Sequence, residues 1–461
     1  MADETMSVDD LDLPEKARRF FAEQWGIERL HPPQKQSIEP IFTGKSALIA
    51  IPTASGKSLI AYMGILRKLL LEEVGSKAVY IVPLKALATE KYEELTQLGK
   101  ALNLTIGLGI GDATSEAKKI NQCDILVCTS EKLDSLIRNR SETMSNVSII
   151  VADEFHLLND ASRGPTLEIN LTKLRYLKPN AQIIALSATV GNCNELAKWL
   201  DAELIISDWR PVALEYSTYH DLHLEPRLIQ SSARSSEPGN LKPPRDLVGP
   251  KSHPTWVALE DTLDSQGQLL IFVGTRKSAE SEALKLSKRV QKKLSKENPE
   301  KLDLFASVVS SIEGGRQSAM ADKLIECLKG GTAFHHAGLT HSQRKIVEEA
   351  FKSGIISCLT ATPTLAAGVN LPARRVLVRD IKRWDDGMSR PLPVMEIRQM
   401  LGRAGRPKYD DFGEAWVLCK GTDGWEVADM VSEKYFFGEV EPIISKLSGE
   451  PALRTHILSI I

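Results

Sequence analysis

The chain has 461 residues, of which 42% are hydrophobic and 26% are charged, and its formal net charge is −2. This composition is that of an ordinary globular protein of about three domains, and the near-neutral charge excludes a basic coat for nucleic acid over the whole surface. No apolar run approaches the ~18 residues that a membrane span needs, and the acidic N-terminus has no signal-peptide pattern. We therefore expect a cytoplasmic protein that does not contact membranes.

Neither the cysteines nor the lysines gather into an obvious site. The six cysteines are scattered and include no Cys-x-x-Cys pair, which indicates reduced, mostly buried thiols and excludes a disulfide framework or a cysteine metal site. Residues 285–301 form the densest lysine-rich stretch, and a solvated helix face is favoured there over a binding patch.

Short, continuously apolar runs alternate with helical patterns between residues 46 and 206. Such runs are typical of parallel strands buried on both faces and joined by helices in right-handed βαβ units. This region therefore predicts a doubly wound parallel sheet. The expected strands are 47–51, 78–82, 124–128, 148–152 and 182–186, and the expected helices include 58–72 and 84–100.

A second alternating region follows a stretch of different composition. Residues 221–255 hold a serine-rich run and several prolines, a pattern that indicates a flexible surface insertion or connection. Alternation then resumes and predicts a second α/β domain. Its expected strands are 268–273, 332–335, 355–360 and 375–378.

Residues 51–58, Ile-Pro-Thr-Ala-Ser-Gly-Lys-Ser, predict a phosphate-binding loop between a strand and a helix. Gly56 permits backbone N–H groups to approach a phosphate, Lys57 would neutralise the β- and γ-phosphate oxygens, and Ser58 can ligate Mg²⁺. Ile51 stands where the strict pattern has its first glycine, so a coincidental Gly-Lys-Ser turn is the alternative. The loop residues expected to hold the nucleotide are Thr53, Ala54, Ser55, Gly56, Lys57 and Ser58.

Two acidic residues follow the expected strand 148–152. Carboxylates at the carboxyl end of a buried parallel strand face the ligand crevice of such folds. Asp153 would hold Mg²⁺, and Glu154 would orient or deprotonate the attacking water. A solvated turn is the alternative for this common dipeptide. His156 is expected to couple the turn to the Ser-Ala-Thr sequence at 187–189.

Arg403 and Arg406 lie three residues apart in the glycine-punctuated segment 399–406. They would project from one face of a helix, and two guanidinium groups suit the charge that develops on a transferring phosphoryl group. A pair of surface salt bridges is the alternative. With Lys57, Asp153 and Glu154, the two arginines predict hydrolysis of a nucleoside triphosphate between two domains.

With further motifs in the same order, the chain resembles superfamily-two helicases, specifically the Ski-like group and, within it, the archaeal DNA-repair helicases of the Hjm type. The resemblance runs through nearly the whole chain. Its other motifs are Leu-His-Pro-Pro-Gln at 30–34, Pro-Leu-Lys-Ala-Leu-Ala at 83–88, Thr-Ser-Glu-Lys at 129–132, Arg-Gly-Pro-Thr-Leu-Glu at 163–168, Ile-Phe-Val-Gly-Thr-Arg at 271–276, Phe-His-His-Ala-Gly-Leu at 334–339 and Ala-Thr-Pro-Thr-Leu-Ala-Ala-Gly-Val-Asn-Leu-Pro at 361–372.

The resemblance assigns roles to residues that lie within these motifs. It implies that Gln34 recognises the adenine edge, that Gly368 and Asn370 link the nucleic-acid track to ATP, and that Gln399 contacts the nucleotide. The residues implied to line the single-strand track are Lys85, Thr129, Arg163, Thr275, Arg276 and Thr362.

The resemblance also implies a domain organisation. Two RecA-like domains would span 1–207 and 208–420, and 421–461 would be the start of a winged-helix domain. The last residues begin like a helix near Pro451, and its apolar face ends with nothing after it. We therefore expect a truncated motor core that lacks a downstream helical domain.

Residues 376–394 predict a hairpin, because two extended runs flank Asp386-Gly387. In the resembled family, a hairpin at this place splits the duplex. Trp384 would stack on a base, and Lys382 and Arg383 would contact phosphates. A plain connecting hairpin is the alternative.

The resemblance implies an ATP- and Mg²⁺-dependent DNA helicase that acts as a monomer. It would translocate 3′ to 5′ on single-stranded DNA and unwind forked or branched duplex in replication-associated repair, within the nucleoid. Replication or recombination proteins are open as partners. The alternatives are an RNA helicase of the same group and a nucleotide-gated clamp that binds nucleic acid without unwinding it.

Overall fold

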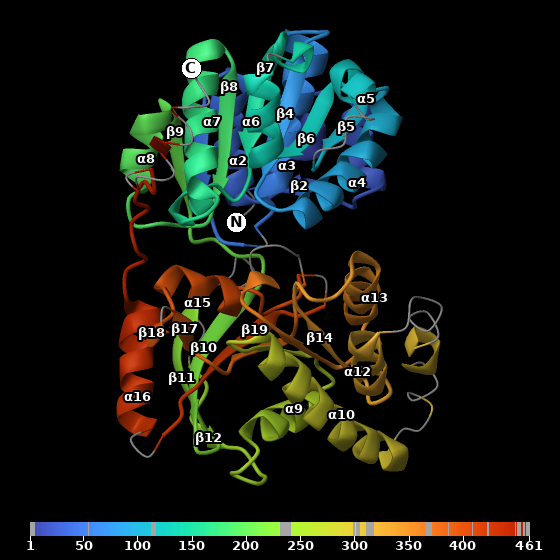
Figure 1. Ribbon diagram of the computed structural model, residues 1–461, viewed down its shortest axis with the longest axis vertical. Coiled ribbons are helices and arrows are strands. Elements are labelled where there is room, and N and C mark those ends of the chain that lie inside the picture. The colour runs from blue at the N-terminus through green and yellow to red at the C-terminus, as the bar shows by residue number, and fades with distance from the viewer. Residues whose placement is uncertain are drawn as a thin grey trace. The chain divides into compact units, whose positions relative to one another are not determined.

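A computed structural model gives the fold of the chain in two compact units (Figure 1). Unit 1 comprises residues 1–209 and 441–461, and unit 2 comprises 210–440. The structure describes residues 5–457 except 54, 112–116, 140, 231–240, 298–299, 301–304, 310–317, 366–370, 386, 408, 422–423, 448, 450–452 and 455–456.

Unit 1 is built on a seven-stranded parallel sheet with the order β5-β6-β4-β7-β8-β3-β9. Helices lie on both of its faces (Figure 1). The strands are β3 (Ala47–Ala50), β4 (Lys77–Val82), β5 (Ile106–Gly109), β6 (Ile125–Thr129), β7 (Val147–Ala152), β8 (Gln182–Ser187) and β9 (Glu203–Ile206), and the helices are α1 (Glu15–Glu23), α2 (Pro32–Phe42), α3 (Lys57–Arg67), α4 (Lys85–Leu102), α5 (Ala117–Gln122), α6 (Ser130–Arg138), α7 (Gly164–Leu177) and α8 (Cys193–Leu200).

The five strands predicted in this region are confirmed, each to within one residue at either end. The central strands β3, β6, β7 and β8 are buried along their whole length, which is why they are apolar on both faces and carry no alternating pattern. A short π-helical turn, Lys68–Glu72, continues α3 to the end of the expected helix.

Unit 2 has an eight-stranded sheet with the order β12-β11-β10-β19-β16-β13-β15-β14. In this order, every pair of neighbouring strands from β10 across to β14 is parallel. β11 pairs antiparallel with both β10 and β12. The strands are β10 (Ala213–His220), β11 (His223–Gln230), β12 (Arg245–Asp246), β13 (Leu269–Phe272), β14 (Thr332–His335), β15 (Cys358–Ala361), β16 (Arg375–Val378) and β19 (Phe412–Leu418), and the helices include α9 (Pro254–Asp264), α10 (Arg276–Glu297), α12 (Ala319–Leu328), α13 (His341–Lys352), α15 (Val394–Leu401) and α16 (Gly424–Val431).

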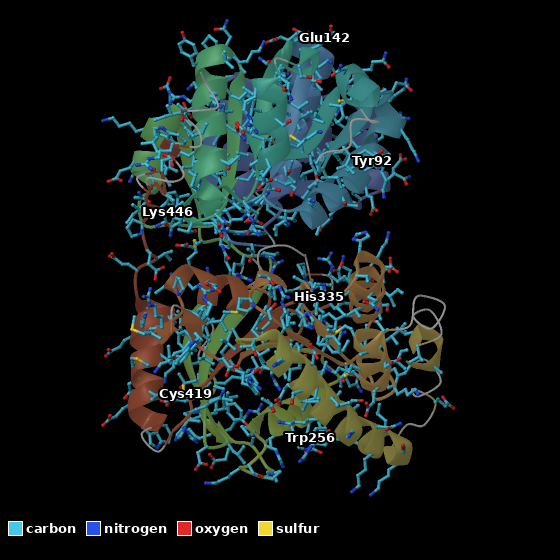
Figure 2. All side chains as sticks on the ribbon, viewed as in Figure 1. Tyr92, Glu142, Trp256, His335, Cys419 and Lys446 are labelled. Atoms are coloured by element: carbon cyan, nitrogen blue, oxygen red, sulfur yellow. The ribbon has the colours of Figure 1, made fainter. Side chains whose placement is uncertain are left out.

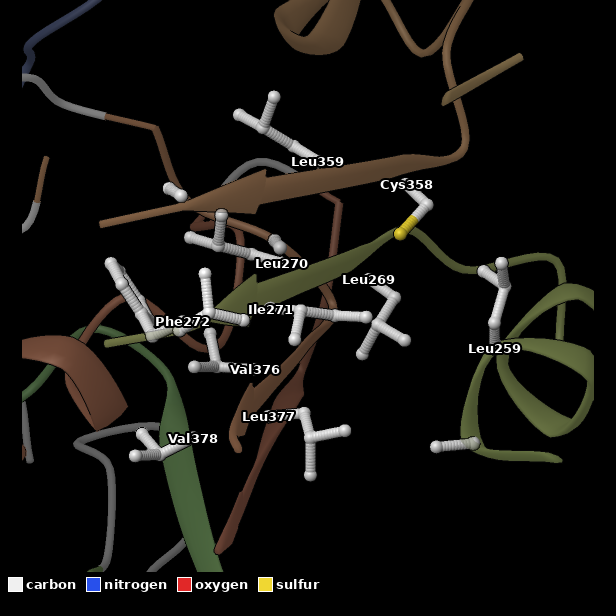
Figure 3. Packing of buried hydrophobic residues seen from close by; sticks show 14 of the residues in the cluster. Leu259, Leu269, Leu270, Ile271, Phe272, Cys358, Leu359, Val376, Leu377 and Val378 are labelled. Carbon is white, nitrogen blue, oxygen red and sulfur yellow. The ribbon is translucent and has the colours of Figure 1, made fainter. Parts of the chain in front are cut away.

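The core of unit 2 lies on both sides of β13, β15 and β16. Figure 3 shows the apolar side chains of these neighbouring strands packed together, with Leu259 of α9 nearby. Ile271 lies opposite Leu377 on one neighbouring strand and opposite Thr360 on the other, and all four strands from β16 to β14 are buried throughout. The second predicted α/β domain is therefore confirmed as a fold.

The expectation of a flexible connection over 221–255 is wrong for residues 223–230. These residues form β11, which pairs with β10 along its length. The strand escaped prediction because it is only partly buried and because Pro226, which lies at an irregularity in the pairing, argues against a regular strand.

The described part of 421–461 does not form a third compact unit. Residues up to Val440, including α16 and the π-helical turn Ser432–Phe437, group with unit 2, and Glu441 onwards groups with unit 1. Asn192 of unit 1 makes one of these contacts. Its side-chain amide donates to the Ile443 carbonyl and accepts from the Ile443 N–H. The winged-helix assignment stays a prediction.

All six cysteines are free and buried, as their scattered positions suggested. Cys419, labelled in Figure 2, lies at the end of β19, and burial raises the pKa of its thiol to about 12. Among the described residues, none of the helices combines the length and the apolar character required to cross a membrane.

Candidate active site and nucleic-acid interface

The phosphate loop connects β3 to α3, which begins at Lys57. Gly56 caps this helix with a left-handed backbone, φ +76°, and a Cβ atom placed there would lie 2.2 Å from Nε2 of Gln34. Only glycine therefore fits this close approach. Ser55 is fully buried and donates its hydroxyl to the carbonyl of Trp209, 3.1 Å away.

Lys57 brings together the ends of two neighbouring strands. Its buried ammonium group donates to the carbonyls of Ile51, after β3, and Ser187, at the end of β8, each at 3.1 Å. Its positive charge also acts on two nearby groups. It lowers the pKa of Asp153, partly offsetting the effect of burial, and it lowers the pKa of His156 in the same direction as burial. The predicted phosphate-binding lysine thus lies among the other predicted catalytic groups.

Asp153 and Glu154 follow β7 directly. Glu154 has φ +51°, a left-handed conformation that is uncommon for a residue with a side chain and that concentrates at functional sites. The tight turn lets the Glu154 N–H donate to Oδ1 of Asp153 at 2.9 Å, while the Tyr80 hydroxyl donates to Oδ2 at 2.9 Å. Both oxygens of the buried Asp153 carboxylate are therefore oriented.

The electrostatics of this turn follow from burial. Desolvation, with the adjacent Glu154 charge, raises the pKa of Asp153, and desolvation lowers the pKa of His156 to about 3. His156 is therefore neutral, and its Nδ1 accepts from the Ala188 N–H at 3.4 Å. This bond is the coupling between the two turns that the sequence predicted. The same Nδ1 lies 3.4 Å from Glu154 Oε2. Since the neutral ring carries no positive charge, this contact is not an ion pair.

Ser58 and Asp153 suit a magnesium ion. A hydroxyl and a carboxylate are the hard oxygen ligands that Mg²⁺ takes from proteins, the rest of its shell coming from water and phosphate. Ser58 lies in the first turn of α3, directly after Lys57, and the Asp153 carboxylate is held by the Tyr80 hydroxyl. The donor set therefore fits the predicted cation.

Gln34 lies against the phosphate loop. Its Oε1 accepts from the His31 N–H at 2.8 Å, which closes a capping box at the start of α2, and its Nε2 donates to the Gly56 carbonyl at 3.2 Å. Adenine recognition by Gln34 stays a prediction. The contact with Gly56 adds a second role, which is to fix the loop to α2.

The residues predicted to contact a nucleic-acid strand in unit 1 lie on the same sheet edge as the phosphate loop. Lys85 is exposed at the first turn of α4, after β4, and Thr129 ends β6 and caps α6. Arg163 precedes α7, and its N–H is held by Asp160 at 2.9 Å. Because all the strands are parallel, their carboxyl ends form one continuous edge.

Unit 2 places its predicted strand contacts at the carboxyl ends of β13 and β15. Thr275 and Arg276 are exposed where α10 begins, and Thr275 caps the helix by accepting from the Ser278 N–H at 3.1 Å. Thr362 follows β15 and hydrogen-bonds to the Thr364 hydroxyl at 2.9 Å. Their contact with nucleic acid stays a prediction.

The predicted hairpin is confirmed but shorter than expected. β17 (Lys382–Asp385) and β18 (Met388–Pro391) form a separate two-stranded ribbon, whereas residues 375–378 belong to the main sheet as β16. Trp384 is 72% exposed on this ribbon. Lys382 precedes it, and Arg383 pairs with Glu396 at 3.2 Å.

The two predicted finger arginines differ in their surroundings. Arg403 is buried, but it lies beyond α15, which holds Gln399 and ends at Leu401. The expectation that the two arginines project from one helix face is therefore wrong, because the helix stops before both of them. Arg406 forks onto the buried Asp410, with Nε–Oδ2 at 2.8 Å and Nη2–Oδ1 at 2.9 Å, and its Nη1 donates to Oε1 of Gln268 at 3.0 Å. A salt bridge, the alternative to a finger, is therefore present at Arg406.

Three predicted site residues, Ala54, Gly368 and Asn370, lie outside the described residues. Sequence reasoning missed Tyr80 and Asp410. Asp410 lies four residues after Arg406, and that spacing is a usable signal for an ion pair. Tyr80 lies within a buried strand and carries no comparable local signal.

Two protein families match separate parts of the chain. Residues 31–196 match the DEAD/DEAH box helicase family, and residues 285–408 match the helicase conserved C-terminal domain. The first segment holds every strand of the unit 1 sheet except β9, and the second holds β14, β15 and β16 of the unit 2 sheet, so the two units correspond to the two RecA-like domains of a helicase core.

Relatives match almost the whole chain. The ATP-dependent DNA helicase Hel308 of Methanocella arvoryzae is 43% identical over 462 residues, and that of Pyrococcus horikoshii is 42% identical over 459. Each alignment covers 99% of this chain and 59% of the relative. The Hel308 of Methanococcus vannielii is 40% identical over 95% of this chain and 56% of its own length. The chain thus spans about three-fifths of these relatives, and over almost its whole length it is similar to the Hel308 type of DNA helicase.

Proposed function

We propose that this chain is the motor of an ATP- and Mg²⁺-dependent DNA helicase, which moves 3′ to 5′ along single-stranded DNA and opens forked or branched duplex. The observation that carries the proposal is the convergence of Lys57, Asp153 and Glu154 at the carboxyl ends of the parallel strands β3 and β7, which both pair with β8. The relatives' name, ATP-dependent DNA helicase, supports DNA as the substrate.

Each residue of this cluster has a chemical task in the proposal. Lys57 would neutralise the terminal phosphates of ATP, and Glu154 would orient or deprotonate the attacking water. Ser58 and Asp153 would hold Mg²⁺, and the ion would supply positive charge that offsets the charge developing on the phosphate. Arg403 and Arg406 would add positive charge at the transition state.

The nucleic-acid contacts of the proposal have weak sequence preference, because they are made mainly to phosphate and sugar. The track would comprise Lys85, Thr129 and Arg163 in unit 1 and Thr275, Arg276 and Thr362 in unit 2. The ribbon β17–β18 would split the duplex, with Trp384 stacking on a base at the junction.

The test compares ATP hydrolysis on matched DNA and RNA single strands, and unwinding of a short duplex with a 3′ or a 5′ overhang. We expect stronger stimulation by DNA and unwinding only from the 3′ overhang. Stronger stimulation by RNA would favour an RNA helicase of the same group. Hydrolysis that no nucleic acid stimulates would contradict the motor function.

A further inference from the structure

Tyr80 lies in the middle of β4, next to the candidate magnesium ligand Asp153. Its side chain is fully buried, and β4 is the direct neighbour of β7, which leads to Asp153. The Tyr80 hydroxyl donates to Asp153 Oδ2 at 2.9 Å. One hydroxyl from a buried strand therefore contacts the carboxylate that is assigned to the cation.

The direction of this bond matters. A hydroxyl has one proton to donate, and Tyr80 gives it to the Asp153 carboxylate. A bond donated to a carboxylate favours its ionised form, which is the form that ligates a cation. The carboxylate of Asp153 is fixed at both oxygens, by Tyr80 and by the Glu154 N–H.

We propose that Tyr80 is a positioning residue for the divalent cation, holding the Asp153 carboxylate in the orientation that Mg²⁺ requires. The proposal rests on the assignment of this site to Mg²⁺ and ATP in the proposed function. Partners that orient metal ligands contribute strongly to metal affinity. Tyr80 does not touch the nucleotide in this account and acts only through Asp153.

A second buried layer supports Tyr80 from behind. The ring of Tyr62 on α3 lies 6.0 Å from that of Tyr80, centroid to centroid. The Tyr62 hydroxyl donates to Glu94, which pairs with the buried Lys91 at 3.0 Å, both on α4. Tyr62 is thus a matched control, because it is an equally buried tyrosine with a carboxylate partner that is not a candidate metal ligand.

The test removes one hydroxyl at a time. Binding of a fluorescent ADP analogue to Tyr80→Phe, Tyr62→Phe and the unaltered chain is measured in chelator and then across a Mg²⁺ titration. For Tyr80→Phe we expect the Mg²⁺ concentration at half effect to rise at least ~10-fold, with metal-free ADP affinity unchanged. Tyr62→Phe should match the unaltered chain.

The outcomes separate the positioning role from a structural one. Circular dichroism establishes that each variant is folded at the temperature of the assay, and Tyr80→Met, whose flexible side chain adapts to the core, replaces Tyr80→Phe if the latter does not fold. A folded variant without the hydroxyl that keeps the normal Mg²⁺ dependence would overturn the proposal while leaving the proposed function intact. Failure of the unaltered chain to bind ADP would overturn both.

Discussion

The phosphate-binding edge of unit 1 and the glycine-arginine segment of unit 2 illustrate two ways in which a motif is built. In unit 1, Lys57 and Asp153 follow β3 and β7, the two strands that flank β8, and the Lys57 charge lowers the pKa of Asp153 against the effect of burial. In unit 2, Arg406 is occupied by Asp410 and Gln268 of its own unit. Lys57 and Asp153 are positioned by the strands that precede them, whereas Arg406 also stabilises the fold of its own unit.

The largest effect is expected at the phosphate loop. Lys57→Ala removes the charge that would stabilise the transferring phosphoryl group, and ATP hydrolysis should fall by ~10²-fold or more. Steady-state hydrolysis with single-stranded DNA measures this, and Lys45→Ala, at an exposed lysine of the same unit, should keep its rate. A comparable loss in both variants would show that charge at this site has no special role.

A separate effect is expected at the ribbon β17–β18. Trp384→Ala should reduce unwinding of a short forked duplex by about 10-fold or more, since base stacking on an aromatic ring contributes about 1–3 kcal/mol. Hydrolysis stimulated by single-stranded DNA should survive. Trp425→Ala, at another exposed tryptophan of unit 2, is the control. Equal loss of both activities in Trp384→Ala would mean that the ribbon is structural.

Shortening the tip between Trp384 and Met388 to a tight turn extends this test. Unwinding should then be abolished while DNA-stimulated hydrolysis remains, because the predicted track residues are unaltered. Unchanged unwinding of the short duplex would leave the ribbon as a plain connector.

The comparison between the two arginines is sharpened by stability measurements. Arg403→Ala should lower kcat more than it raises KM, since the charge it meets develops late in the reaction. Arg406→Ala should also destabilise the protein, on the order of 3 kcal/mol, because it leaves the buried Asp410 carboxylate with only the more distant Arg374, 3.7 Å away.

The double variant Arg406→Ala with Asp410→Asn separates the two roles of Arg406. Removing the carboxylate charge should restore much of the stability in denaturant unfolding, whereas the ATPase defect should remain. Recovery of both would mean that Arg406 serves the fold alone. If Arg406→Ala alone lowers neither the stability nor the turnover, both roles of Arg406 are contradicted.

The smallest effect concerns pH. The pKa of His156 is lowered to about 3 in the folded chain from 6.5, so the unfolded chain binds the proton first and stability is lost as pH falls below about 6.5. The loss reaches about 2 kcal/mol near pH 5. Thermal unfolding of His156→Gln should vary less between pH 7.5 and 5, whereas His341→Gln, at an exposed position, should follow the unaltered chain.

The sequence predicted those parts of the fold that are buried on both faces. Strands such as β3 and β13 are continuously apolar and were found at their places. β11 was not, because it is half-buried and interrupted by Pro226. Alternating or mixed strands at a sheet margin resemble loops when only local composition is considered.

The candidate site was predictable where its chemistry is local and unpredictable where it depends on packing. The loop ending in Lys57 and the Asp-Glu turn carry their spacing in the chain itself. The bond from Tyr80 to Asp153 joins residues 73 positions apart, and only the pairing of β4 with β7 brings them together. A buried strand tyrosine is ordinarily a core residue, so sequence patterns alone do not distinguish it.

The central claim is that Glu154 serves the water-activating step at this edge of unit 1. Its most direct test is the DNA-stimulated ATPase of Glu154→Gln, which keeps the shape of the side chain but loses its basicity, with Glu23→Gln, at an exposed position of α1, as the control. The account predicts a fall in kcat of ~10²-fold or more with ATP still bound. DNA-stimulated hydrolysis that remains intact in Glu154→Gln would contradict the account.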